Sequence, residues 1–192
     1  MRLFVAVEID PSVVAALAEF GSSLRRRAQT LAPAARISWV SPEQLHVTSR
    51  FIGEVDDKKA AVIAGVLLEE LAIDPFDLVV EGAGAFPERG APRVLWAGIS
   101  AGVAELGALK AEVSRRLMDC SVPREDRPYR PHVTLARVRE PAGLRTPALF
   151  ETPADRRFGT THVEAITLFQ SRTSPKGAVY TPLHRTRLHP RS

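Results

Sequence analysis

Residues 45–53 read Leu-His-Val-Thr-Ser-Arg-Phe-Ile-Gly, and residues 130–137 read Arg-Pro-His-Val-Thr-Leu-Ala-Arg. Each stretch sets a His-Val-Thr tripeptide in an apolar run that is typical of a β-strand. Alternate residues of a strand point to the same face, so the histidine and the threonine project together while the valine points to the core. Two such strands on opposite walls of a cleft would bring two imidazoles and two hydroxyls to one volume.

The sequence around these stretches mixes strands and helices without a linker or low-complexity segment between them, which indicates one α+β unit with two halves facing one cleft. Apolar residues at helical spacing predict three helices: Val13, Leu17, Phe20 and Leu24 after Asp10; Val62, Ile63, Val66, Leu67 and Leu71 after Asp56; and Val103, Leu106, Leu109, Val113 and Leu117. The predicted strands are residues 3–9, 37–40, 45–52, 76–80, 94–99, 163–170 and 179–188, with one more from His132. Gly- or Pro-rich loops are predicted at residues 82–92, 123–128 and 141–153.

Size and composition are those of an ordinary soluble protein, with 192 residues, 45% apolar and 25% charged. We expect a single domain over residues 1–192. One cysteine, Cys120, cannot form an internal disulfide, which favours a reducing compartment and the cytoplasm. Glu8 and Asp10 interrupt the apolar start before a signal peptide would be complete, and no apolar run reaches the about 18 residues that span a membrane.

The formal net charge of +4 would favour a polyanionic ligand without identifying one. Arginine accounts for 22 of the 26 basic residues. Its planar guanidinium suits phosphate, but a GC-rich genome explains the excess at least as well.

A third His-x-Thr, His184-Arg185-Thr186, warns that the tripeptide alone is weak evidence. Arginines surround this copy, whereas the other two have valine at the centre and an apolar continuation. We interpret His184 as surface structure. A single half-buried histidine at position 46 or 132 would also be read as structural, but the matched pair favours catalysis.

Together the two stretches resemble the paired His-x-Thr-x motifs of the two-histidine (2H) phosphoesterases, and among them the RNA 2′,3′-cyclic phosphodiesterases, also called 2′-5′ RNA ligases. The resemblance extends over most of the chain. It includes residues 2–7 (RLFVAV), 39–40 (WV), 93–98 (RVLWAG), 168–171 (LFQS) and 177–180 (GAVY). Ser49 departs from the apolar residue that is more common there, but it points with Val47 toward the core and should affect packing more than chemistry.

The resemblance implies an α+β fold of two pseudo-symmetric lobes, whose mostly antiparallel sheets line a central cleft with helices packed outside. It implies hydrolysis of a terminal RNA 2′,3′-cyclic phosphate to a 2′-phosphate, with His46 as the proton donor to O3′ and His132 as the proton acceptor. The sequence by itself does not tell donor from acceptor. Thr48 and Thr134 would donate hydrogen bonds to phosphate oxygens, although plain β-propensity is the alternative for both.

Two arginines are candidate phosphate ligands, because Arg130 precedes His132 by two residues and Arg50 follows His46 by four. If the strands are regular, both share the catalytic face, although a solvated surface arginine is the alternative for each. The same alternation turns Phe51 away from that face into the core. Trp39 and Trp96 could stack on a base, but core packing is the favoured interpretation.

No cofactor or metal is required by this chemistry, and the sequence offers no cluster at metal-ligand spacing and no Gly-x-x-x-x-Gly-Lys loop. The expected partner is RNA with a 2′,3′-cyclic phosphate end, without a membrane, and the expected state is a monomer. Reversible 2′-5′ RNA ligation is a secondary reaction of the same site. The alternatives are a non-catalytic RNA-binding module and a structural protein with incidental histidines.

Overall fold

A curved sheet runs through the whole protein in the computed structural model, which describes residues 1–125, 127–150, 156–174 and 177–190. Hydrogen-bonded neighbours follow the order β4-β10-β9-β1-β3-β7-β6-β5-β8, and β2 pairs with β7 beside this path. Among the described strands, every pairing is antiparallel except that of β10 with β4. The strands are β1 (Arg2–Glu8), β2 (Arg36–Trp39), β3 (His46–Glu54), β4 (Leu71–Ala72), β5 (Phe76–Phe86), β6 (Val94–Ala101), β7 (His132–Glu140), β8 (Arg157–Val163), β9 (Ala165–Ser174) and β10 (Gly177–His189).

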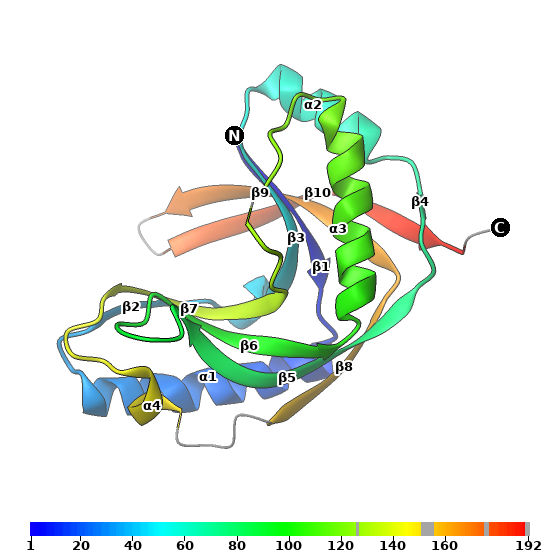
Figure 1. Cartoon of the computed structure of the whole chain (residues 1–192). Coiled ribbons are helices and arrows are strands. Elements are labelled where there is room, and N and C mark those ends of the chain that lie inside the picture. Colours follow the sequence, from blue (N-terminus) through cyan, green and yellow to red (C-terminus); the bar gives the residue numbers. More distant parts are fainter. Residues whose placement is uncertain (126, 151–155, 175–176, 191–192) are drawn as a thin grey trace.

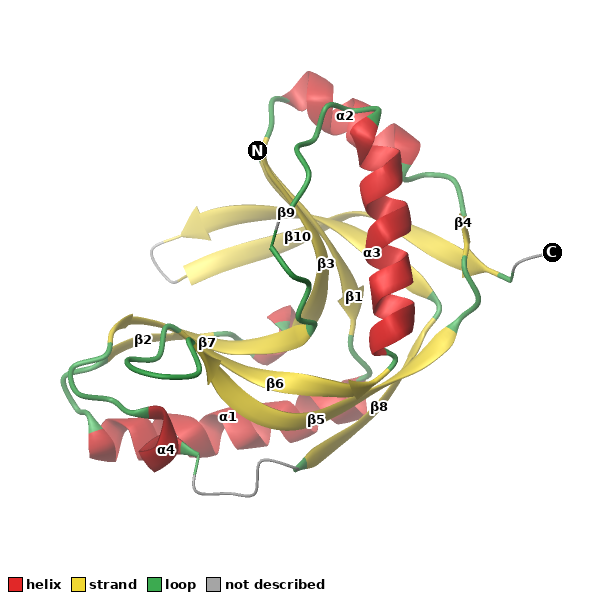
Figure 2. Ribbon diagram, in the orientation of Figure 1, coloured by secondary structure: helices red, strands yellow, loops and turns green. Residues whose placement is uncertain are grey.

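Helices cover the outside of two lobes, as Figures 1 and 2 show. Helices α2 (Asp57–Val66) and α3 (Val103–Met118) lie against the lobe built on β1, β3, β9 and β10. Helices α1 (Pro11–Leu31) and α4 (Thr146–Leu149) lie against the lobe built on β5 to β8, and a 3-10 turn, η1 (Pro42–Gln44), precedes β3. The predicted α+β fold is confirmed, whereas the single domain over residues 1–192 stays a prediction.

Helix α1 forms where the apolar spacing predicts it. Asp10 caps the helix by accepting a hydrogen bond from the backbone N–H of Ser12 at 2.8 Å. The residues expected on its core face, and those of α3 except Val103, are buried. None of the helices in the described ranges is long and apolar enough to cross a bilayer.

Three predicted segments differ from the structure. Leu71 lies in β4, because α2 ends at Val66. The predicted strand 163–170 is divided between β8, which the sequence analysis missed, and β9. The predicted loop 141–153 contains the short helix α4, and its residues 151–153 lie outside the described part of the chain.

Strand β5 also continues to Phe86, through the first half of the predicted loop 82–92. Gly82 in this part of β5 has a positive φ of 77°, whereas Gly84 is needed for close packing. A Cβ atom at Gly84 would lie 2.6 Å from the ring of Trp96 on the neighbouring strand β6, so glycine lets β5 pass beneath the indole.

We therefore expect Gly84→Ala to lower the free energy of unfolding by about 1–3 kcal/mol, because the methyl group would displace the Trp96 ring. Urea denaturation measures the difference. The matched control is Gly107→Ala on α3, where nothing lies within 4 Å of the added Cβ, and where alanine should stabilise the helix by about 0.5–1 kcal/mol. Equal stability of wild type and Gly84→Ala would contradict the packing account.

Candidate active site

The two lobes meet where β3 pairs with β7, at Val47 and Val133. Both valines are fully buried. Because side chains alternate along each strand, the residues on either side of these valines point to the opposite face. That face therefore carries His46, Thr48, His132 and Thr134. The expected convergence is present, but the motifs lie on adjacent strands of one sheet rather than on separate walls.

Both imidazole rings are oriented in the same way by the main chain. Nδ1 of His46 lies 2.7 Å from the carbonyl oxygen of Gln44, and Nδ1 of His132 lies 2.7 Å from the carbonyl oxygen of Arg130. A carbonyl oxygen only accepts hydrogen bonds, so each Nδ1 carries a hydrogen and donates it. Nε2 is then the nitrogen that each ring offers for proton transfer.

The threonines follow the histidines by two residues on the same strands. Oγ1 of Thr48 is 3.1 Å from Nε2 of His46. With Nδ1 already protonated, the neutral ring accepts a hydrogen bond from the Thr48 hydroxyl. Thr134 is half-buried on β7 beside His132. The Thr48 hydroxyl thus borders Nε2 of His46, and Thr134 holds the matching position after His132 on β7.

The pKa of both histidines lies below the ordinary imidazole value. Burial is the largest cause for each, and the hydrogen bond to the backbone carbonyl partly opposes it. The positive charge of Arg137 lowers both pKa values further, and the charge of His132 also lowers that of His46. Neutral imidazoles are therefore favoured in the free protein near neutral pH.

A β-bulge follows each His-x-Thr and breaks the alternation of the strand. In β3 the pairing with β1 skips Ser49, and in β7 the pairing with β6 skips Leu135. The two residues at each bulge are buried, and the fifth residue after each histidine returns to the catalytic face. These residues are Phe51, with 53% of its surface exposed, and Arg137.

The predicted orientations of Arg50 and Phe51 are therefore wrong. Arg50 is only 3% exposed and points away from the histidines, where its Nη1 lies 3.2 Å from Oε2 of Glu125. It also donates to the carbonyl oxygens of Phe51 and Pro123. Phe51 instead faces the site, where its ring lies 6.2 Å from that of Phe4, which in turn lies 5.0 Å from the ring of His46.

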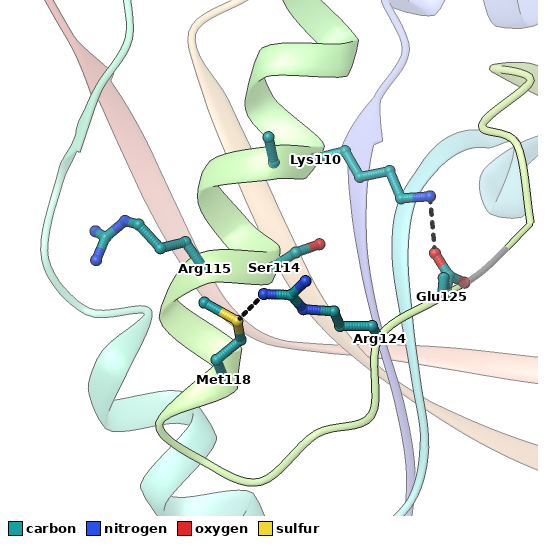
Figure 3. Close-up of a pocket in the computed structure, with 7 residues that line it drawn as sticks. Lys110, Ser114, Arg115, Met118, Arg124 and Glu125 are labelled. Carbon is teal, nitrogen blue, oxygen red and sulfur yellow. Dashed lines mark hydrogen bonds and ion pairs between the residues drawn. The ribbon is translucent and has the colours of Figure 1, made fainter.

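The described residues of the connection from α3 to β7 contact the face of β3 opposite to His46. Glu125 pairs with both Arg50 and Lys110 through Oε2. Figure 3 shows the pair with Lys110, whose Nζ lies 3.0 Å from this oxygen. The hydroxyl of Tyr129 donates to the carbonyl oxygen of Thr48 at 3.1 Å, and Lys110 lies over the Tyr129 ring. Arg130, which follows Tyr129, accepts the hydrogen bond from Nδ1 of His132. This connection therefore contacts both His-x-Thr motifs. Asp126 within it lies outside the described residues.

The side chain of Arg130 is 64% exposed and lies 2.8 Å from Glu88, in the connection between β5 and β6. Its main chain is the part in contact with His132. Arg137, by contrast, acts on both imidazoles and was not singled out by the sequence analysis, although it ends the second quoted stretch. Arg137 is five residues after His132, and strand alternation would turn an odd offset away from the catalytic face. Only the bulge in β7 shows that Arg137 faces the histidines.

Aromatic rings surround both histidines. Tyr180 of β10 meets the ring of His46 edge-on at 5.3 Å, and Phe86 meets the ring of His132 edge-on at 5.2 Å. Trp96 packs against Phe86 at 5.2 Å, while Trp39 packs against the core. Trp96 therefore belongs to the surroundings of His132 as well as to the packing of β5 on β6.

The third His-x-Thr lies elsewhere, on β10. Thr186 is buried and donates to the carbonyl oxygen of Leu67 at the end of α2, and His184 is half-buried. This copy links β10 to α2. No group of three histidine, cysteine or acidic side chains that could hold a metal ion is present among the residues that the structure describes.

A two-lobed sheet with paired His-x-Thr motifs at its centre defines the class of two-histidine phosphoesterases. The profile of the 2′-5′ RNA ligase superfamily matches residues 15–175. The chain belongs to this superfamily, and the resemblance noted from its motifs is confirmed.

Individual relatives agree with this membership. The chain is 33% identical to an RNA 2′,3′-cyclic phosphodiesterase of Archaeoglobus fulgidus, over 95% of this chain and 98% of that protein. It is 36% identical to one of Thermus thermophilus, over 96% and 89%. A solved structure of a Thermus thermophilus protein superposes with a TM-score of 0.80 at 31% identity over the whole of both chains. Escherichia coli LigT in its apo form gives 0.73 at 25% identity, over 97% of this chain and 96% of LigT.

The electrostatics of the site predict that both imidazoles titrate below about pH 6.5. Arg137→Gln should raise both pKa values, because it removes a positive charge that disfavours each imidazolium. Titration of the two ring C–H signals by NMR measures the shift. Arg130→Gln is the control, since the Arg130 charge is paired with Glu88. Unchanged titration in Arg137→Gln would show that Arg137 does not act on the histidines.

The buried position of Arg50 predicts a loss of stability on substitution. Arg50→Ala removes the guanidinium that donates to the carbonyl oxygens of Phe51 and Pro123, and it leaves Lys110 alone to pair with Glu125. It should lower the free energy of unfolding by about 2–4 kcal/mol. Arg124→Ala, in the same connection, should change it by less than about 0.5 kcal/mol. Similar chemical denaturation midpoints for the two variants would contradict this structural role.

Proposed function

We propose that the protein is an RNA 2′,3′-cyclic phosphodiesterase, which hydrolyses a terminal 2′,3′-cyclic phosphate to a 2′-phosphomonoester. One observation carries the proposal: two imidazoles, each with Nδ1 bound to a main-chain carbonyl and Nε2 offered on one face, lie on paired strands. The activity named for the relatives supports it.

Hydrolysis needs one proton acceptor and one proton donor on opposite sides of the phosphorus. Nε2 of His132 accepts a proton from water as the water oxygen forms a bond to phosphorus. The bond from phosphorus to O3′ breaks, and Nε2 of His46 gives its proton to O3′. His132 leaves the reaction protonated and His46 neutral, and exchange with solvent restores both.

The lowered pKa values fit these roles in different ways. A pKa below the ordinary value keeps His132 neutral, as a base must be. His46 must carry a proton, which burial and Arg137 disfavour in the free protein. A bound anionic phosphate offsets this effect, because a nearby negative charge favours the imidazolium. His46 is thus protonated when substrate is present.

Charge that develops on the phosphate is stabilised by Arg137, Thr48 and Thr134, which share the face of the two histidines. Arg137 takes the phosphate-binding role that the sequence analysis gave to Arg50 and Arg130. Arg50 instead links β3 to Glu125 and so helps to position this strand. Arg130 orients His132 through its main-chain carbonyl group.

Side chains supply all the groups in this scheme, so we propose a reaction without metal or cofactor. We also propose that the enzyme acts as a monomer and in the cytoplasm. A 5′-hydroxyl that replaces water would attack the same phosphorus and displace O3′, which gives a 2′-5′ linkage. Ligation is therefore a secondary activity of the same groups.

Catalytic amounts of enzyme, in EDTA, should convert a short RNA with a 2′,3′-cyclic phosphate end to the 2′-phosphate. His46→Ala and His132→Ala should each lower kcat/KM by about 10²–10⁴-fold, since each removes one proton-transfer group. Chromatography against 2′- and 3′-phosphate standards identifies the product.

His184→Ala is the matched control, because it removes the histidine of the third His-x-Thr, and it should keep wild-type activity. Circular dichroism checks that each variant is folded. Turnover that survives both active-site substitutions would refute the two-histidine mechanism. RNA binding without turnover by the wild type would favour the non-catalytic RNA-binding module.

A further inference from the structure

A cavity of about 390 Å³ adjoins His46 on the side away from Arg137 and β7. It lies where the end of β1, the first turns of α1 and η1 meet strands β9 and β10. The ring of His46 forms part of its wall, next to Tyr180 and Phe169. Its volume falls within the range of small-molecule sites, about 300–1,000 Å³. The catalytic scheme leaves this cavity unused.

The position of the cavity relates it to one part of the substrate, provided that the proposed function holds. His46 protonates O3′, so the ribose that carries O3′ lies on the His46 side of the phosphorus. Two groups leave that ribose: the base, from C1′, and the upstream RNA, from C5′. The cavity beside His46 lies on this side, within reach of both groups.

The charges of the lining select between the two. Glu8 and Glu43 both line the cavity, whereas none of its described lining residues is an arginine or a lysine. A hydrogen bond from the Ser41 hydroxyl holds the pKa of Glu43 below its ordinary value, so this carboxylate is ionised near neutral pH. Glu8 lies 3.7 Å from Nε of Arg185, which partly offsets its charge, so the Glu43 carboxylate is the main group that repels the phosphodiester of the upstream RNA. The base, which is uncharged, meets no such repulsion.

The remaining lining also suits a base. Val14 and Ile9 are apolar, and Phe169 and Tyr180 present aromatic rings. Flat apolar surfaces of this kind bind nucleobases by stacking. Carboxylate oxygens act only as acceptors, and therefore favour a base with an amino group.

We propose that this cavity binds the base of the nucleotide that carries the cyclic phosphate, and that Glu43 and Glu8 make it prefer bases with an exocyclic amino group. Adenine, cytosine and guanine carry such a group and uracil does not. The preference depends only on the terminal nucleotide that carries the cyclic phosphate, because the upstream chain is directed away from the cavity.

Cytidine and uridine 2′,3′-cyclic phosphates are the sharpest pair of probes, because they differ at the C4 substituent and N3 but have the same size. The wild type should show a kcat/KM for the cytidine compound about 5–50-fold above that for the uridine compound. Glu43→Gln should lower the value for cytidine more than for uridine, and so reduce this ratio at least threefold.

Filling the cavity gives an independent measurement. Val14→Trp places an indole in it and should raise KM for both mononucleotides by tenfold or more, with a smaller change in kcat. Leu31→Trp adds the same ring at an exposed position of the same helix and should leave both constants as in the wild type. Circular dichroism and the thermal midpoint identify a variant that is not folded.

Equal kcat/KM for the two mononucleotides in the wild type and in Glu43→Gln would overturn the amino-group preference. An unchanged KM in folded Val14→Trp would overturn the base-binding site itself. Either result leaves the proposed hydrolysis intact, because the wild type still turns over. Absence of turnover with every cyclic phosphate would contradict the proposed function instead.

Discussion

The pairing of β3 with β7 at Val47 and Val133 is the contact on which the site depends. It joins the half-sheets of the two lobes, and it buries both valines completely. Since strand side chains alternate, burial of the central valine of each tripeptide obliges the flanking histidine and threonine to face the other way. A shift of either strand by one residue would bury the imidazoles and expose the valines. The hydrophobic core therefore sets the register of the catalytic groups.

The two bulges then decide which charges approach the imidazoles. After each His-x-Thr, the skipped residue turns the following side chain to the core and returns the next to the site. On β7 this brings Arg137 to the histidines, and on β3 it takes Arg50 away to Glu125. A regular β3 would add a second guanidinium beside His46, whose pKa Arg137 already lowers. A further decrease would oppose the protonated form that the proposed acid requires.

The sequence was most informative where structure depends on residues close together in the chain. The spacing of Val13, Leu17, Phe20 and Leu24 predicts α1, and the His-Val-Thr alternation predicts the shared face of the histidines and threonines. Bulges arise from pairing between strands, so Arg50 could not be placed and Arg137 could not be recognised from the alternation within one strand. The predicted strand 76–80 is shorter than β5 for a related reason. Gly84 is typical of a loop in the sequence, and only the structure shows that the Trp96 ring lies over it.

The two histidines have nearly the same immediate surroundings, with Nδ1 on a carbonyl oxygen, a threonine two residues later and an aromatic ring edge-on. Their own hydrogen bonds therefore give little reason for one to act as the acid and the other as the base. The difference lies farther out, because Tyr180, Phe169 and two carboxylates form a cavity at His46, whereas Phe86 and Trp96 pack against each other beside His132. In the proposed scheme, the imidazole nearer the ribose is the one that donates a proton to O3′. The proposed base-binding surface lies on the side of His46, which agrees with the proposed role of His46 as the proton donor to O3′.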